Sequence, residues 1–299
     1  MRSAPKSPRA ASAGPSAPTR AAPALAAIGV RPSKSRGQNF LVQAAIANRI
    51  VDSAALKPDD HVLEIGPGLG ILSERIAAHR IARLTMVELD PRLAARLEER
   101  FAGDRRTRII LGDFLEADLA GVFDRGPIKV VGNLPFNAAA AILRRLCGNS
   151  RAIDLMVLMF QREVAERIRA HPGQSAYGAL SVFTQLYFEI ESHFRVGAGN
   201  FHPRPKVDAE VLAMRPYPTP RFAAAAEAGV LRTVRAAFSA PRKTLRNALG
   251  GSLGIGAATI EAAVRRAEID PGVRAETLSA DDLLRLAREL EADLKIGDA

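Results

Sequence analysis

The residues best suited to chemistry are Asn133, Leu134, Pro135 and Phe136, which follow an apolar run at residues 128–131. The exocyclic amine of adenine is a poor nucleophile because its lone pair is conjugated with the ring, and two acceptors on its hydrogens would favour a pyramidal, more reactive nitrogen. The side-chain oxygen of Asn133 and the carbonyl of Leu134 can be those acceptors, since Pro135 restricts the backbone before it and fixes that carbonyl in advance. Phe136 offers an aromatic face to a base extruded from its strand. The turn therefore predicts a site that holds the N6 amine of adenine.

A glycine loop lies upstream, where an apolar run at residues 61–65 ends in Gly66-Pro67-Gly68-Leu69-Gly70. Glycines at a strand end let a ligand approach the backbone, and the following helix N-terminus favours an anionic group such as an amino-acid carboxylate. Glu88 ends the next apolar run about twenty residues later, where a carboxylate can accept from both hydroxyls of a ribose. Asp113 follows the third run, where it can accept from an adenine amine while an apolar neighbour covers the ring. These positions predict a nucleoside-type cofactor.

The glycine loop and Glu88 alone do not separate a nicotinamide-dependent oxidoreductase from a methyltransferase. The loop has the spacing Gly-x-Gly-x-Gly and lacks the Gly-x-Gly-x-x-Gly spacing of dinucleotide-binding folds. Asp113 and the turn at Asn133 suit S-adenosylmethionine, whose sulfonium methyl can be transferred by direct displacement without a general base or a metal ion. We therefore predict a methyltransferase that uses S-adenosylmethionine, and we expect no metal site.

Short apolar runs alternate with helical patterns from about residue 42, which predicts an α/β domain with a mostly parallel, Rossmann-like sheet covered on both faces. The candidate strands are residues 61–65, 84–88, 108–111, 128–131 and 153–159. Residues 188–196 and 209–214 are expected to add an antiparallel hairpin at the sheet edge. Because parallel strands place their carboxyl ends along one edge, the glycine loop, Glu88, Asp113 and Asn133 should converge there.

The three prolines at 216, 218 and 220 mark a boundary, beyond which no strand-like alternation persists. Residues 283–294 keep apolar side chains at helical spacing, with Ser279 as a fitting N-cap. We therefore expect a methyltransferase domain at residues 33–216 and a small α-helical C-terminal domain at residues 217–299.

The formal net charge of +10 is concentrated at the N-terminus, where residues 1–36 hold seven basic residues and no acidic one. Residues 1–32 are rich in Ala, Pro and Arg, a composition that cannot offset the entropy of ordering, so we expect a disordered tail. Its Arg and Ala content also leaves an organelle transit peptide open.

A second basic segment lies between Glu227 and Glu261, an interval without acidic residues. Arg242, Lys243 and Arg246 within it are candidates for contact with RNA phosphates, although such a run is also typical of a solvated face.

Composition excludes several classes of protein. The single cysteine, Cys147, permits no internal disulfide and is expected to be buried in packing, while the five histidines are scattered. No apolar run approaches the roughly 20 residues that span a bilayer, and the N-terminus lacks a secretory apolar block. We expect a cytoplasmic enzyme that is monomeric and does not associate with membranes.

These motifs, in this order, resemble the small-subunit ribosomal RNA adenine dimethyltransferase family, often called KsgA, which has a class I methyltransferase fold. The resemblance runs from about residue 33 to the C-terminus and rests on residues 36–41, the glycine loop, Glu88, residues 112–113, residues 133–136 and residues 201–208. It implies dimethylation of N6 on two adjacent adenines in a hairpin loop near the 3′ end of 16S RNA, within a pre-small-subunit particle.

The resemblance also implies roles for individual residues. Cofactor contacts are expected from Gln38, Asn39, Leu41, Gly66, Gly68, Glu88, Asp113 and Asn133. Residues 133–136 are expected to hold the adenine while Phe201 closes on its other face. The family commonly has Tyr where this chain has Phe136, a change that removes a hydroxyl and keeps the stacking ring.

Three other functions compete with this one. A nicotinamide-dependent oxidoreductase is disfavoured by the glycine spacing. A non-catalytic ribosome-assembly factor would not need Asn133 and Phe136. An adenine methyltransferase that acts on large-subunit RNA or on DNA is the nearest competitor, and it is disfavoured by the turn at residues 133–136 together with Phe201, Pro203 and the helical C-terminal segment.

Overall fold

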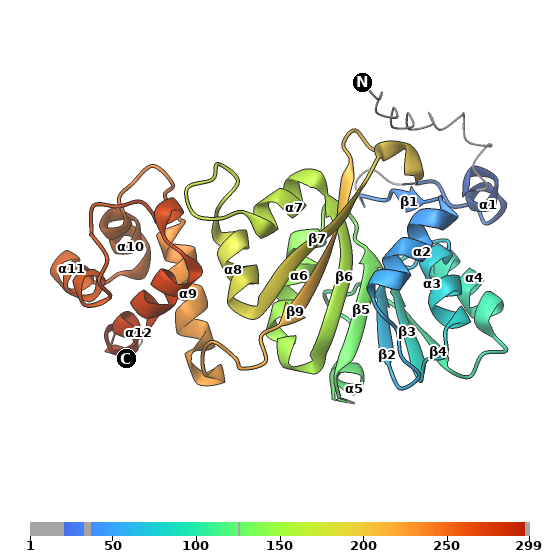
Figure 1. Ribbon diagram of the computed structural model, residues 1–299, viewed down its shortest axis with the longest axis horizontal. Coiled ribbons are helices and arrows are strands. Elements are labelled where there is room, and N and C mark those ends of the chain that lie inside the picture. Colours follow the sequence, from blue (N-terminus) through green and yellow to red (C-terminus); the bar gives the residue numbers. More distant parts are fainter. Residues whose placement is uncertain (1–20, 33–36, 125, 297–299) are drawn as a thin grey trace, which may run out of the picture.

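The computed structural model describes residues 21–32, 37–124 and 126–296, and its centre is a seven-stranded mixed sheet (Figure 1). The strand order is β4-β3-β2-β5-β6-β9-β7. The parallel strands are β2 (His61–Ile65), β3 (Arg83–Glu88), β4 (Thr107–Leu111), β5 (Ile128–Asn133) and β6 (Ile153–Gln161). The chain runs outward from β2 to β4 and then returns to place β5 on the other side of β2. The point at which the strand order reverses therefore lies between β2 and β5.

Side chains along each parallel strand alternate between the two faces of the sheet, as the period of a strand requires. On β2, Val62 faces one core cluster while Leu63 and Ile65 face the other. The first cluster packs against α2 (Ala44–Ser53), α3 (Ile71–Ala78) and α4 (Pro91–Phe101). The second packs against α5 (Ala120–Phe123), α6 (Ala139–Gly148), α7 (Arg162–Arg169) and α8 (Ala179–Tyr187). The predicted α/β sheet with helices on both faces is confirmed.

The predicted edge hairpin is formed by β7 (Phe188–Val196) and β9 (Ala209–Pro216), which pair antiparallel. β9 lies between β6 and β7, so β7 is the outermost strand. The segment that joins them contains η2 (Ala198–Asn200) and β8 (Phe201–His202). β8 pairs antiparallel with β1 (Phe40–Leu41) in a separate two-stranded sheet. Strands of two residues are too short to produce a periodic pattern, so the sequence did not predict this pair.

The N-terminal segment differs from the expected disorder over residues 1–32. Residues 21–32 are described and contain the helix α1 (Ala21–Ala27), in which Leu25 is buried. Leu25 and Val30 pack with Phe40 and Leu93, a tertiary contact that composition alone does not reveal. Residues 1–20 lie outside the described residues.

The chain beyond β9 is helical, as predicted. It holds α9 (Glu227–Ala237), α10 (Leu245–Leu253), α11 (Ala257–Arg266) and α12 (Ala280–Ile296), with 3-10 turns at η3 (Ala224–Ala226) and η4 (Ala275–Thr277); a further turn, η1 (Ser150–Ala152), precedes β6. The Ser279 hydroxyl accepts from the amide of Asp282 at 3.1 Å, and the Asp282 carboxylate accepts from the amide of Ser279 at 2.8 Å. This reciprocal pair caps α12 and confirms Ser279 as its N-cap.

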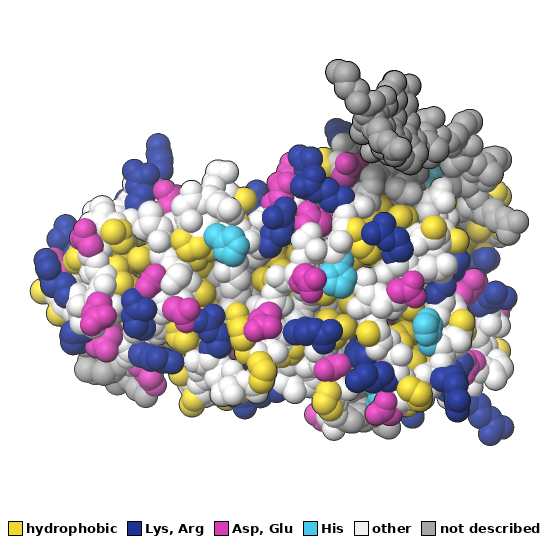
Figure 2. Space-filling model, in the orientation of Figure 1, with side chains coloured by type: hydrophobic (Ala, Val, Ile, Leu, Met, Phe, Trp, Pro, Cys, Tyr) yellow, Lys and Arg dark blue, Asp and Glu magenta, His cyan; other side chains and the backbone are white. Residues whose placement is uncertain are grey.

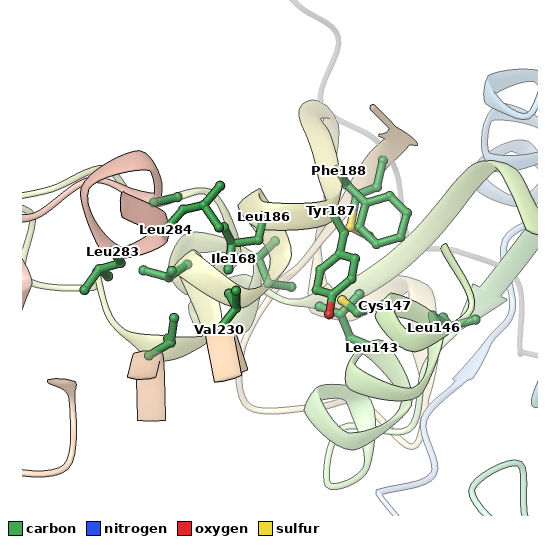
Figure 3. Close-up of a cluster of buried hydrophobic side chains, with 14 of the residues drawn as sticks. Leu143, Leu146, Cys147, Ile168, Leu186, Tyr187, Phe188, Val230, Leu283 and Leu284 are labelled. Atoms are coloured by element: carbon green, nitrogen blue, oxygen red, sulfur yellow. The ribbon is translucent and has the colours of Figure 1, made fainter. Parts of the chain in front are cut away.

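The hydrophobic core continues from the sheet into the C-terminal helices. Leu186 on α8 belongs to the same buried cluster as Val230 on α9 and Leu283 on α12 (Figure 3). The Tyr177 hydroxyl donates to the carbonyl of Leu278 at 2.7 Å, which adds a polar link across this contact. Cys147 is buried in the same cluster, as expected. The two parts of the chain are therefore joined by a packed interface rather than by a free linker.

Candidate active site

A cavity of about 220 Å³ lies at the carboxyl ends of β2, β3, β4 and β5, at the point where the strand order reverses. Such a point is the usual ligand site of an open α/β sheet. Its lining includes Gln38, Asn39, Gly66, Gly68, Glu88, Asp113, Asn133, Leu134 and Pro135. Leu41, Phe136 and Phe201 do not line it. The structure thus brings together most of the predicted site residues and leaves three of them beside the cavity.

The glycine loop needs glycine for two different reasons. Gly66 has a φ of 67°, and a Cβ built there would meet no atom within 4 Å, so the space above it belongs to the cavity. Gly68 has a φ of 57°, and a Cβ there would lie 2.9 Å from Cδ1 of Phe40. A side chain at either position would be strained, and at Gly66 it would also fill the cavity.

Glu88 is held at the rim of the cavity by backbone amides. Its Oε2 accepts from the amide of Gly68 at 2.9 Å, and its Oε1 accepts from the amide of Asp90 at 2.9 Å. Burial raises the pKa of Glu88, and these two backbone hydrogen bonds oppose that rise. Each carboxylate oxygen can still accept a second hydrogen bond, so the geometry suits a pair of ribose hydroxyls.

Asn133 presents an unused acceptor. Its Nδ2 donates to the backbone oxygen of Asn39 at 2.9 Å. Its Oδ1 is buried and accepts no hydrogen bond from any residue that the structure describes. Likewise, none of the hydrogen bonds between described backbone groups ends on the carbonyl of Leu134, the next residue. Because an unpaired buried acceptor is costly, Oδ1 of Asn133 indicates a ligand that donates there.

The loop at residues 37–39 is fitted against the turn that follows β5. Gly37 has a φ of 62°, and a Cβ there would lie 2.7 Å from Oδ1 of Asn137 and 2.9 Å from the amide nitrogen of Phe136. Only glycine permits so close an approach. One wall of the cavity is therefore formed jointly by residues 37–39 and by the turn after β5, which are far apart in sequence.

Asp113 and its neighbours form the side of the cavity at the end of β4. Oδ1 of Asp113 accepts from the amide of Leu115 at 2.8 Å, a turn contact that leaves the other oxygen of the carboxylate for a ligand amine. Phe114 lines the cavity from this side, and Leu89 lines it from the end of β3 with 49 % of its surface exposed. Both side chains contribute apolar lining to the cavity that Asp113 also lines.

The lining also contains residues to which the sequence analysis assigned no role, among them Phe40, Leu89, Leu93 and Asn137. Leu89 directly follows Glu88, so its position at the strand end was a usable signal. The other three reach the cavity through tertiary contacts that no local pattern shows.

The comparisons with known proteins agree with this geometry. A profile described as "Ribosomal RNA adenine dimethylase" matches residues 30–292. The chain belongs to this family. A protein of Geobacter metallireducens named "Ribosomal RNA small subunit methyltransferase A" is 43% identical over 88% of this chain and 97% of its own length. A protein of the same name from Moorella thermoacetica is 42% identical over 88% of this chain and 94% of its own length.

Two solved structures share the fold. The 23S rRNA methyltransferase ErmE is 29% identical with a TM-score of 0.63, and the match covers 85% of this chain and all of ErmE. A dimethyladenosine transferase from Plasmodium falciparum is 23% identical with a TM-score of 0.70, and the match covers 85% of this chain and 98% of that one. This adenine dimethylase is therefore a class I methyltransferase that uses S-adenosylmethionine.

The cavity of this dimethylase fits the cofactor by its own chemistry. Gly66 leaves room against the backbone, Glu88 offers carboxylate acceptors to a ribose, and Asp113 offers one to an adenine amine. Among the ranges with described side chains, no group of three or more His, Cys, Asp or Glu residues is placed to hold a metal ion. In the same ranges no helix is long and apolar enough to cross a membrane.

Glu64 is a buried carboxyl behind the glycine loop that the sequence analysis did not single out. It is 1% exposed, and neither carboxyl oxygen is hydrogen-bonded to a described residue. Its pKa is raised to about 8, mainly by burial and in smaller part by the nearby carboxylate of Glu88, while Ser73 opposes the rise. Glu64 is therefore largely protonated at neutral pH.

The predicted RNA contacts do not line this cavity and lie among the C-terminal helices. Arg242 and Lys243 are exposed in the loop before α10. Arg246 on α10 instead forms an ion pair with Glu261 at 3.0 Å, and Glu261 also pairs with Arg265 at 2.9 Å. Figure 2 shows Lys and Arg side chains over the C-terminal helices with acidic side chains between them. The acid-free interval in the sequence is thus partly neutralised in three dimensions.

A larger hollow of about 720 Å³ lies at the opposite edge of the sheet, between the start of β6 and the end of β9. Arg151, Asp154 and Arg215 in its lining are exposed side chains of both signs. It lacks the buried acceptors that converge on the smaller cavity, so the smaller cavity is the candidate active site.

Proposed function

We propose that this chain dimethylates the N6 amines of two adjacent adenines in a hairpin loop near the 3′ end of small-subunit (16S) ribosomal RNA. The observation that carries the proposal is the buried Oδ1 of Asn133 beside the carbonyl of Leu134: among the described residues, Oδ1 has no hydrogen-bond partner and the carbonyl accepts from no backbone amide. Two such acceptors suit an amine with two hydrogens. The 43% identity to a small-subunit methyltransferase, against 29% to a 23S rRNA methyltransferase, favours small-subunit RNA as the substrate.

The residues of the chain divide the work of the reaction. Gly66, Gly68, Glu88 and Asp113 hold the cofactor at the strand ends, and Gln38 and Asn39 close it from the N-terminal loop. When bound, S-adenosylmethionine supplies the methyl group. Asn133 and Leu134 accept the amine hydrogens of adenine, and Phe136 gives the extruded base a stacking face. The monomethylated amine retains one hydrogen, so the same acceptors can orient it for a second transfer.

Leu41 and Phe201 are buried and do not line the cavity. They face each other across the β1–β8 pair and are 3% and 4% exposed. Phe201 belongs to the core cluster that also contains Val196, so its ring is not free to stack. We therefore assign Phe201 to the floor of the adenine site, in place of the closing face expected from the sequence.

The remaining assignments follow from the substrate. We assign methyl transfer to residues 33–216 and RNA contact to residues 217–299, with Arg242 and Lys243 as the foremost phosphate contacts. We further propose that the enzyme acts as a cytoplasmic monomer on a pre-small-subunit particle. The packed contact between α8 and the C-terminal helices holds the two parts of the chain together, so both can act on one substrate.

The test is incubation of the enzyme with labelled cofactor and either small-subunit or large-subunit RNA particles, followed by mass mapping of methylated adenines. We expect two adjacent dimethyladenines in small-subunit RNA. Methylation confined to large-subunit RNA would show that the chain is instead an adenine methyltransferase of large-subunit RNA. Absence of methylation with both particles, although the cofactor binds, would favour a non-catalytic assembly factor.

A further inference from the structure

We infer that residues 21–30 position Glu88 for the cofactor, through Phe40 on one side and Arg92 on the other. This inference rests on the proposed role of Glu88 in holding the ribose. The segment up to residue 29 precedes the part of the chain that matches the family profile. It nevertheless packs against two residues that line the cavity, Phe40 and Leu93.

The first route from the segment to Glu88 is apolar. Leu25 on α1 and Val30 are 1% and 3% exposed, and they form a small core with Phe40 and Leu93. The ring of Phe40 lies against Gly68, where a Cβ would come within 2.9 Å of it. Gly68 in turn donates its amide to Oε2 of Glu88 at 2.9 Å. The core formed by the segment therefore contacts the glycine loop through Phe40, and this loop holds Oε2 of Glu88.

The second route is polar. The backbone oxygen of Gly29 accepts a hydrogen bond from Nη1 of Arg92. The same guanidinium contacts Asp90, with Nε 3.3 Å from Oδ1 and Nη2 3.2 Å from Oδ2. Asp90 also caps α4 by accepting from the amide of Arg92 at 3.0 Å, and it donates its own amide to Oε1 of Glu88 at 2.9 Å. This route ends on the other carboxylate oxygen.

The two routes fix both oxygens of Glu88. A bidentate contact to a ribose depends on the orientation of the carboxylate, so a small rotation would weaken both hydroxyl contacts together. Neither route includes Asn133 or the turn that holds the base. Loss of the segment should therefore raise the KM for the cofactor, leave kcat at saturating cofactor unchanged, and leave RNA affinity unchanged.

The test compares two single variants, each with an aspartate at one of two neighbouring positions in α1. Leu25→Asp puts a charge into the small core, whereas Ala26→Asp puts the same charge on an exposed position. A second comparison uses chains that lack residues 1–20 or residues 1–30, of which only the latter loses α1. The probes are S-adenosylhomocysteine and its 2′-deoxyribose analogue, with affinities measured by calorimetry.

We expect Leu25→Asp and the longer deletion to weaken S-adenosylhomocysteine binding by about tenfold, the scale of one charged hydrogen bond. The deoxyribose analogue should lose less, so the preference for the ribose falls. Ala26→Asp and the shorter deletion should match the wild type, and Leu25→Met should restore both values. Equal loss for the two probes would mean general damage to the fold and would overturn the inference.

Glu88→Ala separates this inference from the assignment on which it rests. Loss of ribose preference in Glu88→Ala together with wild-type behaviour of Leu25→Asp refutes the role of the N-terminal segment and leaves the ribose site intact. Unchanged binding in Glu88→Ala refutes both.

Discussion

The side-chain nitrogen of Asn133 donates to the backbone oxygen of Asn39 at 2.9 Å, which ties the end of β5 to the loop before β1. A backbone oxygen can only accept, so this contact fixes which end of the Asn133 amide faces it. The amide oxygen is consequently the end left for a ligand, and it has no partner among the described residues. The contact therefore prepares the acceptor before a base arrives.

Asn133→Ala removes this acceptor together with a contact to the wall of the cavity. We expect the methyl-transfer step to slow by about 2–4 kcal/mol, the scale for losing one preorganised hydrogen-bonding group. RNA binding should persist, since no stacking or phosphate contact is removed. The measurement is single-turnover methyl transfer with saturating RNA and cofactor. A near-normal rate would show that Oδ1 of Asn133 does not act on the amine.

Glu88→Ala should weaken binding of S-adenosylmethionine by about 1–3 kcal/mol, the range for hydrogen bonds to a charged group. Glu88→Gln is a sharper variant, because its NH₂ group would face one of the two backbone amides that now donate to the carboxylate. We expect Glu88→Gln to bind no better than Glu88→Ala. Calorimetry checks both, with the exposed Glu98→Gln on α4 as the control. Wild-type affinity in Glu88→Gln would contradict the ribose assignment.

Local patterns predicted the parts of the site that local geometry determines. Glu88 and Asn133 end parallel strands, Gly66 and Asp113 follow the ends of two others, and topology brings such ends together. The helix α1 was missed because its stability comes from one small tertiary core rather than from composition. The ion pair between Arg246 on α10 and Glu261 on α11 was missed for a similar reason, because it joins residues that are 15 positions apart in the sequence.

The burial of Phe201 shows a further limit of sequence patterns. An aromatic residue beside a predicted base site can stack on the base or support it from below, and the two roles produce the same local sequence. The pairing of β1 with β8, which places Phe201 opposite Leu41 within the core, favours the supporting role.

Phe136→Ala should fail at a different step from Asn133→Ala. It removes a stacking surface worth about 1–3 kcal/mol, so the extruded base is destabilised before any methyl group moves. Phe136→Tyr retains the ring on a half-buried side chain and should be nearly neutral. A fluorescent base analogue at the target adenine reports base extrusion directly. Normal extrusion in Phe136→Ala would remove the stacking role.

The basic patch should contribute unequally to RNA binding. Each phosphate contact adds about 0.7–0.9 to the slope of log affinity against log salt concentration. Arg242→Ala and Lys243→Ala should each lower the slope by about that amount, whereas Arg246→Ala should lower it less because Glu261 already pairs with Arg246. Binding titrations at several salt concentrations check this. Equal slopes in all three variants and the wild type would show that these three side chains contact solvent and not RNA phosphates.

Glu64 should make the stability of the protein fall with rising pH. Its native pKa is raised from 4.5 to about 8, mainly by burial. Between these values the unfolded chain binds fewer protons than the native one, so the free energy of unfolding decreases as pH rises through this window and levels off above it. Glu64→Gln removes this dependence and should become more stable than the wild type at high pH, by an amount on the order of a few kcal/mol.

Urea unfolding at pH 5.5 and 8.5 measures the difference, with the exposed Glu99→Gln as control. A difference between Glu64→Gln and wild type that stays constant with pH would show that Glu64 ionises at its ordinary pKa in the native protein.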